Sequence, residues 1–307
     1  MTASSAPQRA HIGFTSHIGA MCALDGLSTP DAQKLARDIE NMGYASLFFP
    51  EGGGKESLTQ AAALLAATEH LVIGTGIANI HLRDAVAAEA GGRALSAMYP
   101  GRFVLGLGVS HQPMVEGRLN KIYEKPLATM RNYLERMASV PETIDQEAGR
   151  PPRILAALGP KMIELSGSDA DGAMPYLVTP EQTRFTRERL GPERWVISEQ
   201  GVTVGGDAEQ QLRRAYNHLH IYDGFENYRA SWRRQGFHDS DFAPGPSEHL
   251  ARSMVAMGGA ESVVAIANAH LDAGADHVVL QVIGDGLYSD PRQALAEIAA
   301  ALELERV

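Results

Sequence analysis

The chain has 307 residues, a formal net charge of −10 and a single cysteine, Cys22. Its basic residues are scattered, which argues against a nucleic-acid surface, and one cysteine excludes an internal disulfide and fits a reducing cytoplasm. No stretch has the apolar core of a signal peptide or the length of a membrane span, so we expect a cytoplasmic protein without a membrane contact.

Apolar runs typical of buried β-strands alternate with helical patterns along the chain. The predicted strands cover residues 11–16, 45–50, 71–77, 103–108, 153–157, 172–177, 195–204 and 277–282. The predicted helices cover residues 30–42, 58–68, 84–98, 124–146, 159–168, 180–190 and 291–304, and a longer helical region covers 207–257. Such alternation predicts a parallel sheet.

Eight strand–helix units in this length fit a closed (β/α)8 TIM barrel that forms a single domain over residues 1–307. An open doubly wound sheet is the alternative, but the first predicted strand lacks the Gly-x-Gly-x-x-Gly turn of dinucleotide-binding folds. Strands seven and eight are too far apart for one helix, which predicts a helical insertion at about residues 205–258. We expect it to serve helix packing or an oligomer contact more than substrate contact.

The strand at residues 103–108 ends in Gly106 and Gly108, and His111 follows it. Glycines at a strand end allow a ligand to lie against the backbone, so this stretch predicts an active-site mouth with His111 at the reaction centre. Alternatively, the two glycines only permit tight packing and His111 is a solvated loop residue. Glu51 at the end of strand two is the other candidate for proton transfer, because either side chain can be tuned towards neutral pH.

A second candidate site lies where strand five turns into a helix, at residues 155–161. Gly159 and Pro160 begin this helix, and its free N–H groups and dipole favour a phosphate, to which Lys161 adds charge. A Gly-Pro helix start without any ligand is the alternative reading. We expect no metal site, since no His-Glu-x-x-His pattern is present; His218 and His220 diverge on a helix and are interpreted as surface histidines.

Several strand-end segments carry a resemblance to a known family. Residues 43–51, 72–80, 100–111 and 158–162 resemble the strand-end motifs of the bacterial luciferase-like monooxygenase superfamily. Within it, Arg83-Asp84 and residues 106–111 and 272–278 resemble a branch of oxidoreductases that use the deazaflavin coenzyme F420. The resemblance implies a (β/α)8 barrel that binds a deazaflavin or flavin at its carboxyl face, and a homodimer.

The resemblance also implies a role for particular residues. A non-prolyl cis peptide is expected at Gly76–Ile77, behind the central ring of the cofactor. The cofactor-binding residues implied are Gly76, Ile77, Ala78, Asn79, Gly108, Val109, Ser110, Ala156, Ala157, Leu158, Gly159, Pro160 and Lys161. The last six of these are expected to lie along the phosphate-bearing side chain of the cofactor.

The sequence departs from related sugar-phosphate dehydrogenases at two places. Those enzymes have a carboxylate followed by histidine after strand two, whereas Glu51 is followed by Gly52-Gly53-Gly54, and they have glutamate where this chain has His111. Their substrate therefore does not transfer to this protein. Three hypotheses follow: an F420-dependent oxidoreductase that moves a hydride to or from a small organic substrate, a monooxygenase that uses reduced FMN and oxygen, and a non-catalytic cofactor-binding barrel.

Overall fold

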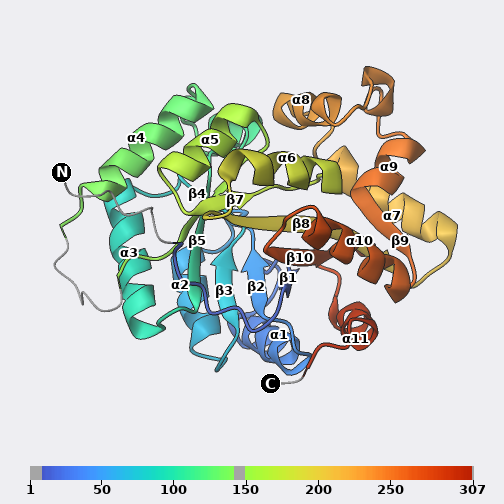
Figure 1. Ribbon diagram of the computed structural model, residues 1–307, viewed down its shortest axis with the longest axis horizontal. Coiled ribbons are helices and arrows are strands. Elements are labelled where there is room, and N and C mark those ends of the chain that lie inside the picture. The colour runs from blue at the N-terminus through green and yellow to red at the C-terminus, as the bar shows by residue number, and fades with distance from the viewer. Residues whose placement is uncertain (1–8, 142–148, 306–307) are drawn as a thin grey trace.

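A computed structural model describes residues 9–141 and 149–305, and its centre is a closed parallel barrel (Figure 1). Eight strands close the barrel, and the last pairs with both the first and the seventh. They are β1 (Ile18–Met21), β2 (Ser46–Phe49), β3 (Val72–Thr75), β5 (Phe103–Gly108), β6 (Arg153–Ala156), β7 (Gly172–Met174), β8 (Trp195–Val204) and β10 (His277–Val282). Short β4 (Ala78–Asn79) pairs with β5, and β9 (Val255–Gly258) pairs with β8 outside the barrel. The predicted TIM barrel is confirmed.

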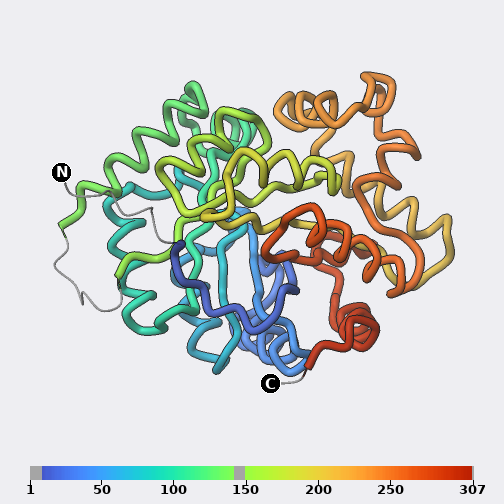
Figure 2. The backbone as a smooth tube through the Cα atoms, in the orientation of Figure 1, coloured from blue at the N-terminus to red at the C-terminus, as the bar shows by residue number. Residues whose placement is uncertain are grey.

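The first predicted strand is wrong, because residues 11–16 are irregular and β1 begins at Ile18. Ile12 and Phe14 belong instead to the apolar cluster inside the barrel. Phe14 stacks on His277, the first residue of β10, with ring centroids 3.8 Å apart, and so helps to close the amino end of the barrel. Figure 2 shows this dark-blue segment running across the front of the barrel strands before it enters β1.

Helices cover the outside of the barrel, and most begin with a capping side chain or a proline in the first turn. They are α1 (Thr29–Asn41), α2 (Ser57–Leu65), α3 (Ala85–Met98), α4 (Pro126–Ala138), α5 (Pro160–Ser168), α6 (Pro180–Leu190), α10 (Ala260–Asp272) and α11 (Arg292–Ala301). The helix predicted at 124–146 ends at Ala138, and residues 142–146 lie outside the described residues. One turn of π-helix, Pro113–Arg118, follows β5.

Between β8 and α10 the chain forms α7 (Ala208–His220), α8 (Glu226–Arg234), a 3-10 turn (Asp239–Asp241), α9 (Glu248–Met254) and β9. Figure 1 shows α7, α8 and α9 gathered on one side of the barrel. They share an apolar cluster around the fully buried Trp232, and this cluster includes Leu177 and Ile283, which follow barrel strands β7 and β10. The region therefore packs against the carboxyl end of the barrel.

A buried histidine outside the barrel makes folding sensitive to acid. His270 of α10 hydrogen-bonds Thr183 Oγ1 at 2.8 Å and Gln200 Oε1 at 3.0 Å, and burial lowers its pKa from 6.5 to about 4. The folded protein thus binds this proton less readily than the unfolded chain, so the contribution to stability is complete above pH 6.5 and is lost as the pH falls towards 4.

We therefore expect wild-type protein to lose roughly 2–3 kcal/mol more unfolding free energy than His270→Gln between pH 7.5 and 4.5. Urea denaturation at both pH values measures the difference. Parallel losses in the two proteins would show that His270 keeps an ordinary pKa when folded.

Candidate active site

The predicted active-site mouth lies at the carboxyl end of the barrel. Its floor is apolar and is made by inward-facing side chains of several strands. Met21, Phe48 and Met174 surround Gly76, where an added Cβ would lie 2.7 Å from Met21 Cε and 3.5 Å from Met174 Sδ. Only a residue without a side chain fits there without displacing a neighbour. The floor is therefore apolar and closely packed at the point where β3 ends.

The structure brings together the predicted residues after β3 and β5. The Gly76–Ile77 peptide is cis, as expected, and Asn79 of β4 pairs with Gly108 of β5. A Cβ on Gly108 would meet Ile77 Cδ1 at 2.5 Å, and one on Gly106 would meet Thr75 O at 1.9 Å. The space beside both glycines is thus occupied by the 75–77 segment, which a side chain at either position would displace.

Glu51, the first proton-transfer candidate, lies in a buried ion pair. Arg83 donates from Nη1 to Oε2 at 2.9 Å and from Nη2 to Oε1, and the backbone N–H groups of Ser57 and Asn79 donate at 3.0 and 2.8 Å. The Glu51 side chain is only 1% exposed. Both carboxylate oxygens are fully engaged, which gives Glu51 the geometry of a residue that holds β4 in place.

Arg83 pairs with Glu51 and Glu56, and not with the nearer carboxylates in the sequence, Asp84 and Glu89. Asp84 caps α3 and pairs with Arg136, while Glu89 pairs with two other arginines inside the barrel wall.

His111, the second candidate, is half-buried beneath the 205–258 region. Its ring stacks on Phe225 with centroids 4.3 Å apart and lies 5.6 Å from the Tyr228 ring. Burial lowers its pKa below the ordinary value, and a hydrogen bond with Asn227 opposes that shift. The imidazole is therefore neutral at physiological pH and able to accept a proton.

The 156–161 segment begins α5, as predicted, with Gly159 at the N-cap. Sequence reasoning missed Arg234, whose Nη2 donates to Leu158 O at 3.2 Å and lies 3.9 Å from the position of a Cβ on Gly159. Burial lowers the pKa of Arg234, which stays far above neutrality. A guanidinium from α8 therefore stands beside the amino end of α5, and Lys161 is exposed there.

The opposite side of the mouth holds a polar cluster that the sequence did not reveal. The Tyr176 hydroxyl lies 3.1 Å from His218 Nε2 and 3.0 Å from the Tyr222 hydroxyl, and it donates to Gln281 Oε1 at 2.9 Å. His218 is buried, and burial lowers its pKa to about 4, so its interpretation as a surface histidine is wrong. His220 is exposed and pairs with Asp223.

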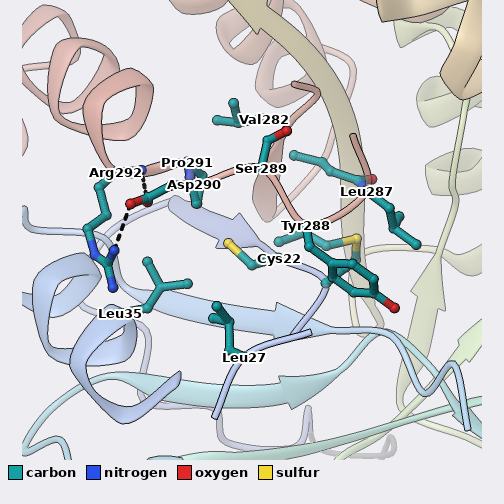
Figure 3. Close-up of a pocket in the computed structure, with 13 residues that line it drawn as sticks. Cys22, Leu27, Leu35, Val282, Leu287, Tyr288, Ser289, Asp290, Pro291 and Arg292 are labelled. Atoms are coloured by element: carbon teal, nitrogen blue, oxygen red, sulfur yellow. Dashed lines mark hydrogen bonds and ion pairs between the residues drawn. The ribbon is translucent and has the colours of Figure 1, made fainter. Parts of the chain in front are cut away.

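A pocket of about 100 Å³ opens beside this cluster, between the ends of β1 and β10 and helices α1 and α11 (Figure 3). Met21 and Gln281 line it on the side of the barrel, and Cys22, Leu35 and Tyr288 are among the other lining residues. Figure 3 shows Arg292 and Asp290 paired at its edge. Gln281 thus lines this pocket and also accepts a hydrogen bond from Tyr176.

Residues 9–141 and 149–305 contain no group of three or more His, Cys, Asp or Glu side chains arranged to hold a metal ion. No helix within these same ranges has both the length and the apolar character needed to cross a membrane.

A closed parallel barrel with ionisable side chains gathered at the carboxyl ends of its strands is the architecture of TIM-barrel enzymes. Residues 10–267 match the family model described as luciferase-like monooxygenase, and the chain belongs to this family. The resemblance seen in the sequence is thereby confirmed, and the protein is an enzyme of a family that includes oxidoreductases and monooxygenases.

One curated relative is named for the coenzyme that it uses. A Mycobacterium tuberculosis protein, named provisionally as a coenzyme F420-dependent oxidoreductase, is 26% identical over 187 residues, which are 51% of this chain and 54% of that protein. The chain spans about half the length of the curated relatives it matches.

Among solved structures, an F420-dependent secondary alcohol dehydrogenase with an F420-acetone adduct matches with a TM-score of 0.71 at 15% identity, over 95% of this chain and 99% of that one. The FMN-bound oxygenating constituent of 3,6-diketocamphane monooxygenase from Pseudomonas putida matches with a TM-score of 0.67 at 14% identity, over 92% and 95%. At these identities the two structures establish the fold.

Proposed function

We propose that the protein transfers a hydride between the deazaflavin coenzyme F420 and a small organic substrate. The observation that carries the proposal is the mouth itself, where an apolar floor, a half-buried neutral histidine and a cationic helix start lie at the ends of neighbouring strands. The names of the F420-dependent relative and of the alcohol dehydrogenase with the same fold support the choice of cofactor.

The residues present fit a flat ring with an anionic tail. Met21, Phe48 and Met174 offer an apolar surface around Gly76, and the open N-cap at Gly159 next to Arg234 suits a phosphate. A bound deazaflavin supplies hydride transfer and activates oxygen poorly. Residues 76–79, 108–110 and 156–161 would hold it.

In this proposal His111 is the proton-transfer residue. When the substrate is oxidised, the neutral imidazole accepts the proton released from it, and Phe225 shields the ring from water. Glu51 is reassigned from proton transfer to positioning, since both its oxygens are engaged by Arg83 and backbone N–H groups.

Replacing Arg234 should weaken binding of the acidic tail. We expect Arg234→Ala to raise the Kd for oxidised F420 about tenfold, because one charge-assisted contact beside α5 is lost. Arg233→Ala is the matched control, since Arg233 pairs with Glu226 and Asp239 and does not contact Leu158. Fluorescence titration measures both constants. An unchanged Kd for Arg234→Ala would show that the acidic tail does not bind at the amino end of α5.

An FMN-dependent monooxygenase is the second candidate, because an FMN-bound enzyme shares the fold. Parallel titrations with F420 and FMN, followed by oxygen-uptake measurements with the reduced cofactor that binds, decide between the two. Tight binding of F420 without oxygen uptake supports the proposal. Preference for FMN with oxygen consumption would replace the F420 proposal with the monooxygenase.

A homodimer stays a prediction that light scattering can check.

A further inference from the structure

His111 is held by two different elements, one at its backbone and one at its ring. Its carbonyl oxygen accepts hydrogen bonds from the N–H groups of Met114 and Val115, both at 3.0 Å, so the turn that follows β5 fixes the backbone. The imidazole ring lies against the first turn of α8, where Phe225 stacks on one face with an angle of 10° between the two planes. The orientation of the ring therefore depends on the 205–258 region.

The first turn of α8 is itself a fixed support. Tyr228 and Trp232 lie four residues apart on one side of the helix and are buried in the apolar cluster of the 205–258 region. The Tyr228 N–H donates to Phe225 O at 3.0 Å, and the Phe225 N–H donates to Tyr222 O at 2.9 Å. These contacts fix the rotation of α8 about its axis, and with it the place of the side chains in its first turn.

Asn227, in the same turn, hydrogen-bonds the His111 side chain. This contact raises the pKa of His111, so it favours the protonated ring, which means that the amide oxygen accepts and a ring N–H donates. A neutral imidazole has one N–H group, and its other nitrogen is an acceptor. The contact with Asn227 therefore selects one tautomer and leaves the second nitrogen free to take a proton.

The titratable groups of the elements around this contact are neutral or already paired. They are Tyr123 after β5, Glu226 and Tyr228 of α8, and Glu199 of β8, whose charge acts on Tyr228. Burial raises the pKa of both phenols, and it raises the pKa of Glu199 to about 8. Glu226 is exposed and pairs with Arg233. Within residues 9–141 and 149–305, Asn227 is thus the side chain that acts on the protonation of His111.

We propose that Asn227 is a positioning residue for His111: its amide oxygen holds the ring N–H, so that the other ring nitrogen faces the mouth as the proton acceptor. This inference rests on the proposed function, in which His111 accepts the substrate proton. Phe225 sets the plane of the ring and Asn227 sets its tautomer, so one helical turn supplies both. The 205–258 region therefore takes part in the reaction through His111, without a contact to the substrate of its own.

The first test uses protein without cofactor. Nitrogen-15 NMR of labelled histidine reports the tautomer and the pKa of His111, and the signal that is missing from His111→Ala assigns it. We expect a single neutral tautomer in wild type. Asn227→Leu, which preserves the size of the side chain, should mix the tautomers and lower the pKa of His111 further, because the contact that raises it is lost. Asn227→Asp should raise that pKa, because a carboxylate favours the charged ring.

Asn217→Leu is the matched control, since Asn217 is an exposed asparagine of α7. Its His111 signals should match those of wild type. The same tautomer and pKa of His111 in wild type and Asn227→Leu would overturn the inference, and no rate measurement is needed for that outcome.

A second test follows the reaction. Oxidised F420 is mixed with a panel of small alcohols, hydroxy acids and amines, and the compound that wild type oxidises fastest is used for all variants. We expect Asn227→Leu to lower kcat about tenfold, with KM and the F420 Kd within a few fold of wild type. Asn227→Asp should restore most of the rate and shift the kinetic pKa upwards, which a purely structural role would not do.

The two proposals fail in different ways. Equal kcat values in wild type and Asn227→Leu, or a kinetic pKa that is the same in all variants, would overturn the role of Asn227. Failure of wild type to bind F420 would instead overturn the proposed function and the catalytic part of this inference with it. In that case the NMR comparison still decides whether Asn227 sets the tautomer of His111.

Discussion

His111→Ala should lower the rate of hydride transfer by roughly two to four orders of magnitude while leaving the F420 Kd within a few fold of wild type. The histidine ring stacks on Phe225 and is held neutral by burial, so its removal takes away the base without removing a charge from the cofactor site. Single-turnover absorbance changes of the cofactor measure the rate, and fluorescence titration measures the Kd.

His70→Ala is the matched control for that variant, because His70 is exposed and precedes β3 at the other end of the barrel. It should react like wild type. If His111→Ala instead loses F420 binding and retains its rate at saturating F420, His111 is a cofactor contact and another group accepts the substrate proton.

Arg83→Met should cost about 3–5 kcal/mol of unfolding free energy, because it leaves the buried Glu51 carboxylate without its cationic partner. Arg83 and Glu51 side chains are 9% and 1% exposed, so water cannot replace the missing contacts. Urea denaturation measures the loss. Arg131→Met is the control, since Arg131 is half-exposed and lies 3.9 Å from Asp169; it should change stability by less than 1 kcal/mol.

A double variant tests the reason for this loss. Arg83→Met combined with Glu51→Gln removes the uncompensated charge, so it should be more stable than Arg83→Met alone. A double variant as unstable as the sum of the two single changes would mean that the residues stabilise β4 independently and not as a pair.

The barrel could be predicted because most of its strands are continuous apolar runs. The first strand could not, because Ile18–Met21 contains a glycine that its neighbours require: a Cβ on Gly19 would lie 1.9 Å from Ser46 Oγ. Local strand preference is weak there, and Ile12 and Phe14 carry a stronger apolar signal although they close the barrel end.

Sequence motifs predicted the residues on one side of the mouth but not those on the other side. Residues 76–79 and 108–111 follow adjacent strands, so strand-end motifs were enough to find them. Tyr176, His218 and Gln281 meet only through the fold, across 42 and 105 residues of chain. One signal was present: Glu199 is a carboxylate inside an apolar strand, which is rarely tolerated without a reason.

Helix α8 connects two parts of the site that lie on different strands. Phe225 at its N-cap covers His111, and Arg234 in its last turn reaches Leu158 beside α5. Since one helix carries both contacts, capture of the acidic tail and closure over the imidazole are thermodynamically linked. Under the proposed function, cofactor and substrate should therefore bind cooperatively, and each should raise the affinity for the other by the same factor in either order.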